Sequence, residues 1–187
     1  MTGPSNWSKI ARRIRVPLGF AFAVAYVWLA KPNAVYMAGG AVMIALGLLL
    51  RASASGHVRK NEQLATTGPY AHTRNPLYLG SLIMAAGFGV AGRNWWIAAI
   101  IIVFFLAIYL PVIRGEEAFL RAKFPEFAAY AAKVPRLLPR LGAFETGGEF
   151  SWELYKKHRE YNALIGSLVL SAILIAKLFW QAKHGAF

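Results

Sequence analysis

The chain contains no cysteine and no aspartate, so all of its acidic residues are glutamates. The lack of cysteine excludes disulfide bonds and thiolate metal sites. The lack of aspartate removes a residue that many metal-dependent enzymes use to hold the ion. The four histidines show neither the HExxH pattern nor any paired spacing, and the sequence has no serine nucleophile elbow. We therefore expect no metal site and no serine hydrolase activity.

Long apolar runs, by contrast, are abundant. Hydrophobic residues make up 57% of the 187 residues, and the mean hydropathy is +0.43, which is high for a soluble domain of this size. Five stretches each approach the ~20 residues that cross a bilayer as a helix. They cover residues 16–30, 34–50, 76–92, 94–113 and 162–180. The sequence thus predicts an all-α, polytopic membrane protein with about five transmembrane helices in a single domain, residues 1–187.

The first apolar stretch allows two interpretations. Lys9, Arg12, Arg13 and Arg15 precede it, as basic residues also precede the apolar part of a signal peptide. No clear small-residue cleavage site appears before the second stretch begins. We therefore favour a span that is retained in the protein.

The formal net charge of +13 could indicate a nucleic-acid partner, but its distribution points elsewhere. With the spans in place, segments 1–15, 51–75 and 114–161 share one side and hold 17 of the 21 Lys and Arg residues. The positive-inside rule puts this side and the N-terminus in the cytoplasm, at a cell inner membrane or an endomembrane. We expect the basic charge to set the topology and to bind lipid headgroups, with no nucleic-acid partner.

The segment after the fourth stretch, residues 116–139, has the pattern of an interfacial helix. Leu120, Phe124 and Phe127 recur at helical spacing among charged residues, and Pro125 interrupts the pattern. The sequence therefore predicts a cytoplasmic amphipathic helix that begins at Glu116 and is broken at Pro125. This helix could anchor the protein to the membrane surface alone, or it could cover a pocket formed by the third and fourth spans.

The most informative stretch is GPYAHTRNPLYL, residues 68–79, where a polar loop runs directly into the third span. We expect Pro76 to take the first helical position and Asn75, before it, to be the N-cap. A helix N-terminus carries free N–H groups and partial positive charge, so it suits a carboxylate or a phosphate. Arg74 can add a bidentate contact to the same anion. Alternatively, the stretch is a capped helix start whose Arg and Tyr reach the headgroups.

Glu116 and Glu117 form a second group of candidate residues, at the end of the fourth span. Carboxylates near a hydrocarbon boundary need solvent or a partner. Neighbouring helical positions point about 100° apart, so one glutamate can face a pocket while the other pairs with an arginine. The spacing does not choose between them, and both could simply form the acidic first turn of a helix.

Three glycines spell GxGxxG at the far end of the third span: Gly87, Gly89 and Gly92. They follow no strand, so a dinucleotide-binding loop is excluded there. We expect these glycines to serve close helix packing.

The two groups of candidate residues, with Phe124, Tyr130, Val134, Pro135 and Pro139 in the tail, resemble a family of integral-membrane methyltransferases. This family is related to isoprenylcysteine carboxyl methyltransferase and to phosphatidylethanolamine N-methyltransferase. The resemblance covers residues 46–139 and implies a cofactor-binding core there, with the span at 162–180 as an addition. Its Asn-Pro pair, Asn75 and Pro76, is more similar to the phospholipid enzymes, because the carboxyl methyltransferases often have His-Pro.

The resemblance implies that the chain binds S-adenosylmethionine, and it implicates a set of residues. For cofactor binding these are Tyr70, His72, Arg74, Asn75, Pro76, Leu77, Tyr78, Gly80, Glu116 and Glu117. For catalysis they are Arg74, Glu116 and Arg136. The charges of the cofactor agree with this expectation, because Arg74 and the helix start suit its carboxylate and a glutamate suits its ammonium group.

The methyl acceptor is expected to be lipophilic and to enter from the bilayer. A carboxylate acceptor is already nucleophilic and needs a cation nearby, such as Arg51, Arg114 or Arg136. An amine acceptor needs a base, such as a glutamate or a tyrosinate. Two other functions remain open: a membrane reductase of the sterol-reductase kind that uses NADPH, and a non-catalytic lipid-binding or assembly subunit.

Overall fold

The computed structural model describes residues 6–59, 62–145 and 147–185, and within these ranges the regular structure is entirely helical. This confirms the all-α prediction. η1 is a 3-10 turn and η2 is a π-helical turn. The elements are α1 (Asn6–Leu29), α2 (Ala34–His57), η1 (Gly68–Ala71), α3 (Pro76–Gly92), α4 (Trp95–Phe104), η2 (Phe105–Tyr109), α5 (Leu110–Lys123), α6 (Phe127–Lys133), α7 (Trp152–Lys157) and α8 (Tyr161–His184).

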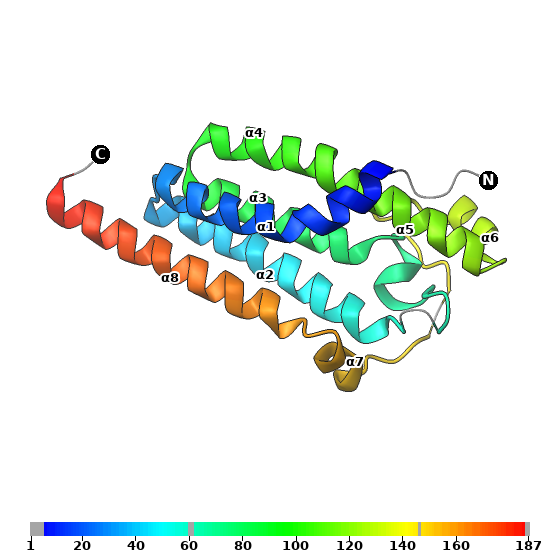
Figure 1. Ribbon diagram of the computed structural model, residues 1–187. Helices are drawn as coiled ribbons and strands as arrows, with labels where there is room; N and C mark the ends of the chain where they lie inside the picture. Colours follow the sequence, from blue (N-terminus) through cyan, green and yellow to red (C-terminus); the bar gives the residue numbers. More distant parts are fainter. Residues whose placement is uncertain (1–5, 60–61, 146, 186–187) are drawn as a thin grey trace.

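The long helices run side by side, while the short helices gather at one end of the molecule (Figure 1). η1, α6 and α7 lie at this end, with the end of α5. The turns after α1 and α3 lie at the opposite end, beside the C-terminal half of α8. The polar loops therefore share one end of an apolar bundle.

α2 and α3 are packed closely because glycines face each other across their contact. A Cβ atom at Gly40 would lie 2.4 Å from the Gly87 carbonyl oxygen, and one at Gly47 would lie 2.6 Å from that of Gly80. Only residues without a side chain allow this approach. The predicted packing role is confirmed for Gly87, and Gly80 likewise lies against α2.

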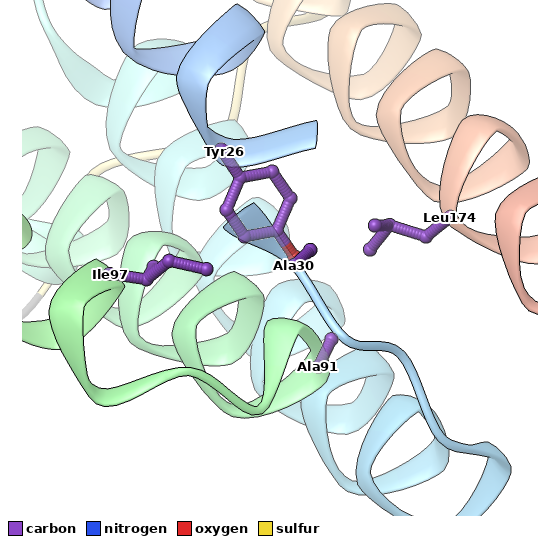
Figure 2. Close-up of a cluster of buried hydrophobic side chains, with 5 residues drawn as sticks. All are labelled: Tyr26, Ala30, Ala91, Ile97 and Leu174. Carbon is purple, nitrogen blue, oxygen red and sulfur yellow. The ribbon is translucent and has the colours of Figure 1, made fainter. Parts of the chain in front are cut away.

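The end of the bundle away from the short helices is held by a small core and by two capped turns. Figure 2 shows Tyr26 and Ala30 beside Ala91, Ile97 and Leu174, so α1, α3, α4 and α8 all contribute to this core. The Tyr26 hydroxyl donates to the Phe88 carbonyl at 2.8 Å. The caps are Asn33 and Asn94, whose side chains accept from backbone N–H groups two residues ahead.

α4, η2 and α5 form one continuous helix, Trp95–Lys123. Pro111 lacks an N–H and so cannot donate to the Ala107 carbonyl, four residues before it. The π turn precedes this proline, and the indole N–H of Trp7 on α1 donates to the Ala107 carbonyl at 2.9 Å. The prediction of a separate amphipathic helix that begins at Glu116 is therefore wrong, because the helix accommodates Pro111 and continues. The predicted break at Pro125 is confirmed between α5 and α6.

Three stretches are long and apolar enough to cross a bilayer: Ala34–His57, Trp95–Lys123 and Tyr161–His184. The prediction of about five spans is confirmed for these three, and they include the additional C-terminal helix. α3 is apolar, but its 17 residues are fewer than the ~20 that cross a bilayer as a helix. α1 has 24 residues, but three arginines interrupt its first half.

Candidate functional site

A cavity of about 770 Å³ lies where the bundle meets the short helices. Its lining comes from α1, from the end of α2, from the start of α3, and from η1, α5, α6 and the residues just before α8. This volume falls within the ordinary range for small-molecule sites, roughly 300–1,000 Å³. The cavity therefore joins segments that are far apart in the sequence.

Most residues that the sequence singled out lie around this cavity. The described lining includes Tyr70, Arg74, Asn75, Pro76, Leu77, Tyr78, Glu116 and Glu117. Three candidates are not in the described lining: Gly80 faces α2, Arg136 lies behind Glu117, and the imidazole Nδ1 of His72 lies 3.2 Å from the Arg140 carbonyl. The structure thus brings the helix start and the two glutamates to one place.

The start of α3 has the expected position but a different side-chain arrangement. Pro76 is the first helical residue, and Asn75 precedes it. The Asn75 side chain makes no cap hydrogen bond, so that part of the prediction is wrong. Its amide instead donates to Glu117 Oε1 at 3.1 Å and to the Arg136 carbonyl at 2.9 Å. The carboxylate, as a charged acceptor, draws the amide away from the helix N-terminus.

Glu117 is buried within a group of donors. Arg136 Nε and Nη2 each lie 2.9 Å from Glu117 Oε2, while Arg74 Nε lies 3.3 Å from Oε1. The geometry of this last contact is not that of a hydrogen bond, and within the described residues the buried Arg74 Nε has no hydrogen-bond partner. Glu117 therefore holds the two arginines in place, while Arg74 keeps an unused donor.

Glu116 has a different environment from its neighbour. The Tyr78 hydroxyl donates to Glu116 Oε1 at 2.9 Å and accepts from Arg15 Nη1 at 3.2 Å. α1, α3 and α5 are thus joined by one chain of polar contacts. The two glutamates point in different directions, as neighbouring helical positions do. Glu117 is ion-paired, whereas Glu116 is hydrogen-bonded to a neutral hydroxyl.

A third polar group closes the side of the cavity toward α8. Arg51 Nε lies 2.5 Å from Glu160 Oε1, and Arg51 also donates to the Leu77 carbonyl and to the Ser81 hydroxyl. Glu160 is buried just before α8. It thereby connects the C-terminal helix to the start of α3.

Two buried tyrosines complete the lining. The Tyr130 hydroxyl donates to the Tyr70 carbonyl at 2.7 Å, which fixes α6 over η1. Burial raises the pKa of the Tyr70 and Tyr130 hydroxyls well above their usual range. Both hydroxyls are therefore neutral at physiological pH. Because Phe127 and Tyr130 line the cavity, α6 covers it, which agrees with the covering role among the two that the sequence left open.

The tail after α6 runs back along the loop before α3. Arg74 N–H donates to the Pro135 carbonyl at 2.9 Å, and the Thr73 hydroxyl donates to the Leu137 carbonyl at 2.9 Å. Arg140 N–H donates to the His72 carbonyl at 2.9 Å. These bonds hold the tail against the loop whose last residues, Arg74 and Asn75, line the cavity.

Sequence reasoning missed Arg15, Tyr109 and Glu160, which also line the cavity. Arg15 and Glu160 lie 59 or more residues from Arg74 and reach the site only because α1 packs against α5 and α8 packs along α2. No local pattern marks Arg15. An unexplained glutamate at the start of an apolar helix was the one available signal for Glu160, because a carboxylate there requires a partner.

Comparisons with known proteins gave a family match and several relatives. Residues 35–126, about half of the chain, match the family model described as phospholipid methyltransferase. The chain is 26% identical to the protein-S-isoprenylcysteine O-methyltransferase of Schizosaccharomyces pombe over 152 residues, 74% of this chain and 61% of that protein. These matches confirm the resemblance inferred from the sequence.

Two further relatives are metal-resistance proteins by name. The chain is 39% identical over 104 residues to the cobalt-zinc-cadmium resistance protein CzcN of Cupriavidus metallidurans, 56% of this chain and 47% of that protein. It is 40% identical over 88 residues to the nickel-cobalt-cadmium resistance protein NccN of Alcaligenes xylosoxydans xylosoxydans, 47% of this chain and 41% of that protein. The chain thus spans about half the length of these two relatives. No solved structure matches it.

Proposed function

We propose that this chain, an integral membrane protein whose residues 35–126 match the phospholipid methyltransferase family, is an S-adenosylmethionine-dependent methyltransferase for a lipophilic substrate. The observation that carries the proposal is the cavity at the start of α3. It lies largely within the matched region. Among the described residues, it combines an arginine that has an unused donor with a carboxylate that has no arginine partner.

The residues around the cavity fit the charges of the cofactor. Within the part of the chain that the structure describes, Arg74 Nε is buried without a hydrogen bond, so a ligand carboxylate would satisfy it. Glu116 would suit an ammonium group or ribose hydroxyls, because it accepts only from Tyr78 among the described residues. The volume of about 770 Å³ leaves room for a second ligand beside the cofactor. When bound, S-adenosylmethionine would supply a methyl group attached to a sulfonium.

The chain's own residues would act mainly by positioning. Methyl transfer is a displacement along a line, which needs alignment more than it needs an acid or a base. Glu117 fixes Arg74 and Arg136, and Tyr78 fixes Glu116, so both charged groups are oriented before a ligand arrives. α6 covers the cavity and would exclude water from it. Arg136 touches Glu117 and acts through it, as a positioning residue.

The same proposal includes an orientation in the membrane. The residues that line the cavity belong to the end of the bundle that carries the polar loops, and most Lys and Arg residues belong to these segments. The positive-inside rule supports a cytoplasmic site and a cytoplasmic N-terminus. The substrate would then reach the site from the cytoplasmic leaflet.

Calorimetric titration of S-adenosylmethionine and S-adenosylhomocysteine into the protein in lipid nanodiscs tests the proposal. We expect saturable binding that weakens at least tenfold in Glu116→Gln and in Arg74→Gln. Glu126→Gln is the matched control, because Glu126 is exposed and does not line the cavity. If the folded wild-type protein binds neither ligand, the proposal fails and a non-catalytic membrane subunit becomes the better account. If it binds NADPH instead, a reductase does.

A further inference from the structure

α8 has few buried contacts with the rest of the bundle. It runs along α2 (Figure 1), and most of its large apolar side chains are exposed. Within the helix, Ser167 and Leu174 are the buried residues, and Lys177 Nζ donates to two carbonyls at the end of α1. α8 follows the region that matches the family, residues 35–126, so the match assigns it no role.

The residues just before α8 form a strained corner at the cavity. Arg159 has a φ of 53°, a left-handed conformation that a residue other than glycine seldom adopts. Its two neighbours, His158 and Glu160, both line the cavity, and His158 Nδ1 lies 3.1 Å from the Ser55 carbonyl. Strain of this kind persists where surrounding contacts hold it, and it is frequent at functional sites. The corner thus brings two side chains from outside the matched region to the cavity.

Glu160 reaches the start of α3 through Arg51. Arg51 Nε lies 2.5 Å from Glu160 Oε1, while Arg51 Nη1 donates to the Leu77 carbonyl at 3.2 Å and also to the Ser81 hydroxyl. Leu77 and Ser81 belong to the first two turns of α3. Charge-assisted contacts of a guanidinium fix its geometry, so Glu160 orients the group that contacts α3.

Gly80 gives the Arg51 side chain its path. A Cβ atom at Gly80 would lie 2.6 Å from Arg51 Cγ, so the stem of Arg51 crosses α3 at a position without a side chain. Arg51 and Glu160 are both largely withdrawn from solvent, where opposite charges attract each other more strongly than in water. Arg51 therefore has one defined position, beside Gly80 and between Glu160 and α3.

We infer that Glu160 is a positioning residue for the proposed cofactor site, so that α8 is a functional part of this site and not only an additional span. Glu160 holds Arg51, and Arg51 holds the first turns of α3. Arg74, the proposed partner of the cofactor carboxylate, lies just before that helix. This inference rests on the proposed function. Small displacements of binding groups cost much in alignment, so a loosened start of α3 would weaken cofactor binding.

An anchoring role alone is the alternative, and Lys177 provides the comparison. Its Nζ lies 2.7 Å from the Val27 carbonyl and 3.1 Å from the Trp28 carbonyl, so it holds the other end of α8. It is not in the described lining of the cavity. Lys177→Met therefore releases α8 far from the site, whereas a change at Glu160 acts on the site itself.

The first experiment removes the charge pair and keeps its bulk. Arg51→Met/Glu160→Leu replaces both charges by apolar side chains, which is often neutral for the stability of an enclosed ion pair. We expect its thermal midpoint to stay within a few degrees of the wild type. Its affinity for S-adenosylmethionine, from calorimetric titration in lipid nanodiscs, should fall at least tenfold, and so should that of Glu160→Gln. If Glu160→Gln fails to fold because Arg51 loses its partner, the double variant carries the test.

Hydrogen–deuterium exchange follows the start of α3 without any ligand. We expect amides of residues 78–82 to exchange at least tenfold faster in both Glu160 variants than in the wild type, because this segment opens more often. Residues 84–90 of the same helix should exchange as in the wild type. Lys177→Met should lower the thermal midpoint, while its exchange at residues 78–82 and its affinity for S-adenosylmethionine stay at wild-type values.

The outcomes separate this inference from the proposed function. Wild-type affinity in both Glu160 variants overturns the positioning role and leaves the proposed function standing. Lost affinity with wild-type exchange at residues 78–82 also overturns it, because Glu160 would then contact the cofactor directly. Equal losses of affinity in Lys177→Met and Glu160→Gln overturn it in favour of anchoring alone. If the folded wild type binds neither S-adenosylmethionine nor S-adenosylhomocysteine, the proposed function fails, and faster exchange in Glu160→Gln then supports only the link from Glu160 to α3.

Discussion

The carboxylate of Glu117 lies 2.9 Å from Arg136 Nη2, and this contact fastens the tail after α6 to the end of α5. The Glu117 side chain is 10% exposed and that of Arg136 is 42% exposed. The pair is therefore a buried carboxylate held by a half-exposed cation. Glu117 lines the cavity while Arg136 lies behind it, so the pair supports the wall of the cavity.

Loss of the Glu117 carboxylate should destabilise the fold. Glu117→Ala leaves Arg74 buried beside no carboxylate, and breaking a pair of this kind costs about 3 kcal/mol, toward the low end for buried pairs because Arg136 reaches solvent. Unfolding of purified protein in detergent, followed by circular dichroism, measures the change. Glu126→Ala, at an exposed position, should remain near the wild type. Equal stabilities of the two variants would contradict the support role.

The α2–α3 contact should not tolerate a side chain at its glycines. A Cβ at Gly47 would lie 2.6 Å from Met84 Cγ and 2.6 Å from the Gly80 carbonyl oxygen. We expect Gly47→Ala to cost about 1–3 kcal/mol, as overpacking does. Gly39→Ala meets nothing within 4 Å and should be neutral or slightly stabilising. Thermal unfolding of both variants decides this, and a stable Gly47→Ala protein would disprove the close approach.

The Tyr26 hydroxyl should stabilise the core far from the site. It donates to the Phe88 carbonyl at 2.8 Å, so Tyr26→Phe removes one buried hydrogen bond and leaves the ring in place. A loss of about 1 kcal/mol is expected. Binding of S-adenosylmethionine should be unchanged, because Tyr26 does not line the cavity. A variant with normal stability and weakened binding would show that the two ends of the bundle are coupled.

Tyr70 should make stability depend on alkaline pH. Burial raises the pKa of its hydroxyl, so the folded chain keeps this proton at a pH where an unfolded tyrosine, with a pKa of about 10, has lost it. The unfolded state then binds fewer protons, and the free energy of unfolding falls as pH rises above about 10. Its contribution is fully present below that pH.

Denaturant unfolding of the wild type and Tyr70→Phe should show a shallower fall of the unfolding free energy in the variant, while the exposed control Tyr36→Phe follows the wild type. Parallel curves for all three would contradict this.

Local sequence was sufficient where local chemistry decides the structure. Pro76 begins α3 because proline suits the first helical position. The helix breaks near Pro125 because a proline inside a helix interrupts its hydrogen bonds. The prediction of a separate helix from Glu116 failed, because the helix continues past Pro111, where a π turn and the Trp7 indole compensate for the missing N–H. That compensation depends on the position of α1, which no local pattern contains.

The candidate site, too, was predicted from the sequence only in part. Arg74, Glu116 and Glu117 were found because charged residues beside apolar spans need partners. Which glutamate pairs with an arginine could not be decided, since only tertiary packing brings Arg136 to Glu117 and Tyr78 to Glu116. Asn75 is the clearest example, because its side chain donates to the Glu117 carboxylate on α5 and does not cap α3 as predicted.

Photocrosslinking of radiolabelled S-adenosylmethionine to the wild-type protein in nanodiscs, followed by tryptic mapping, tests the proposed cofactor site most directly. The account predicts that label appears in the peptide that follows Arg74 and contains Tyr78, or in the one that follows Arg114 and contains Glu116. Excess S-adenosylhomocysteine should abolish this label. Label that persists under competition, or competable label confined to α8, would contradict a cofactor site at the start of α3.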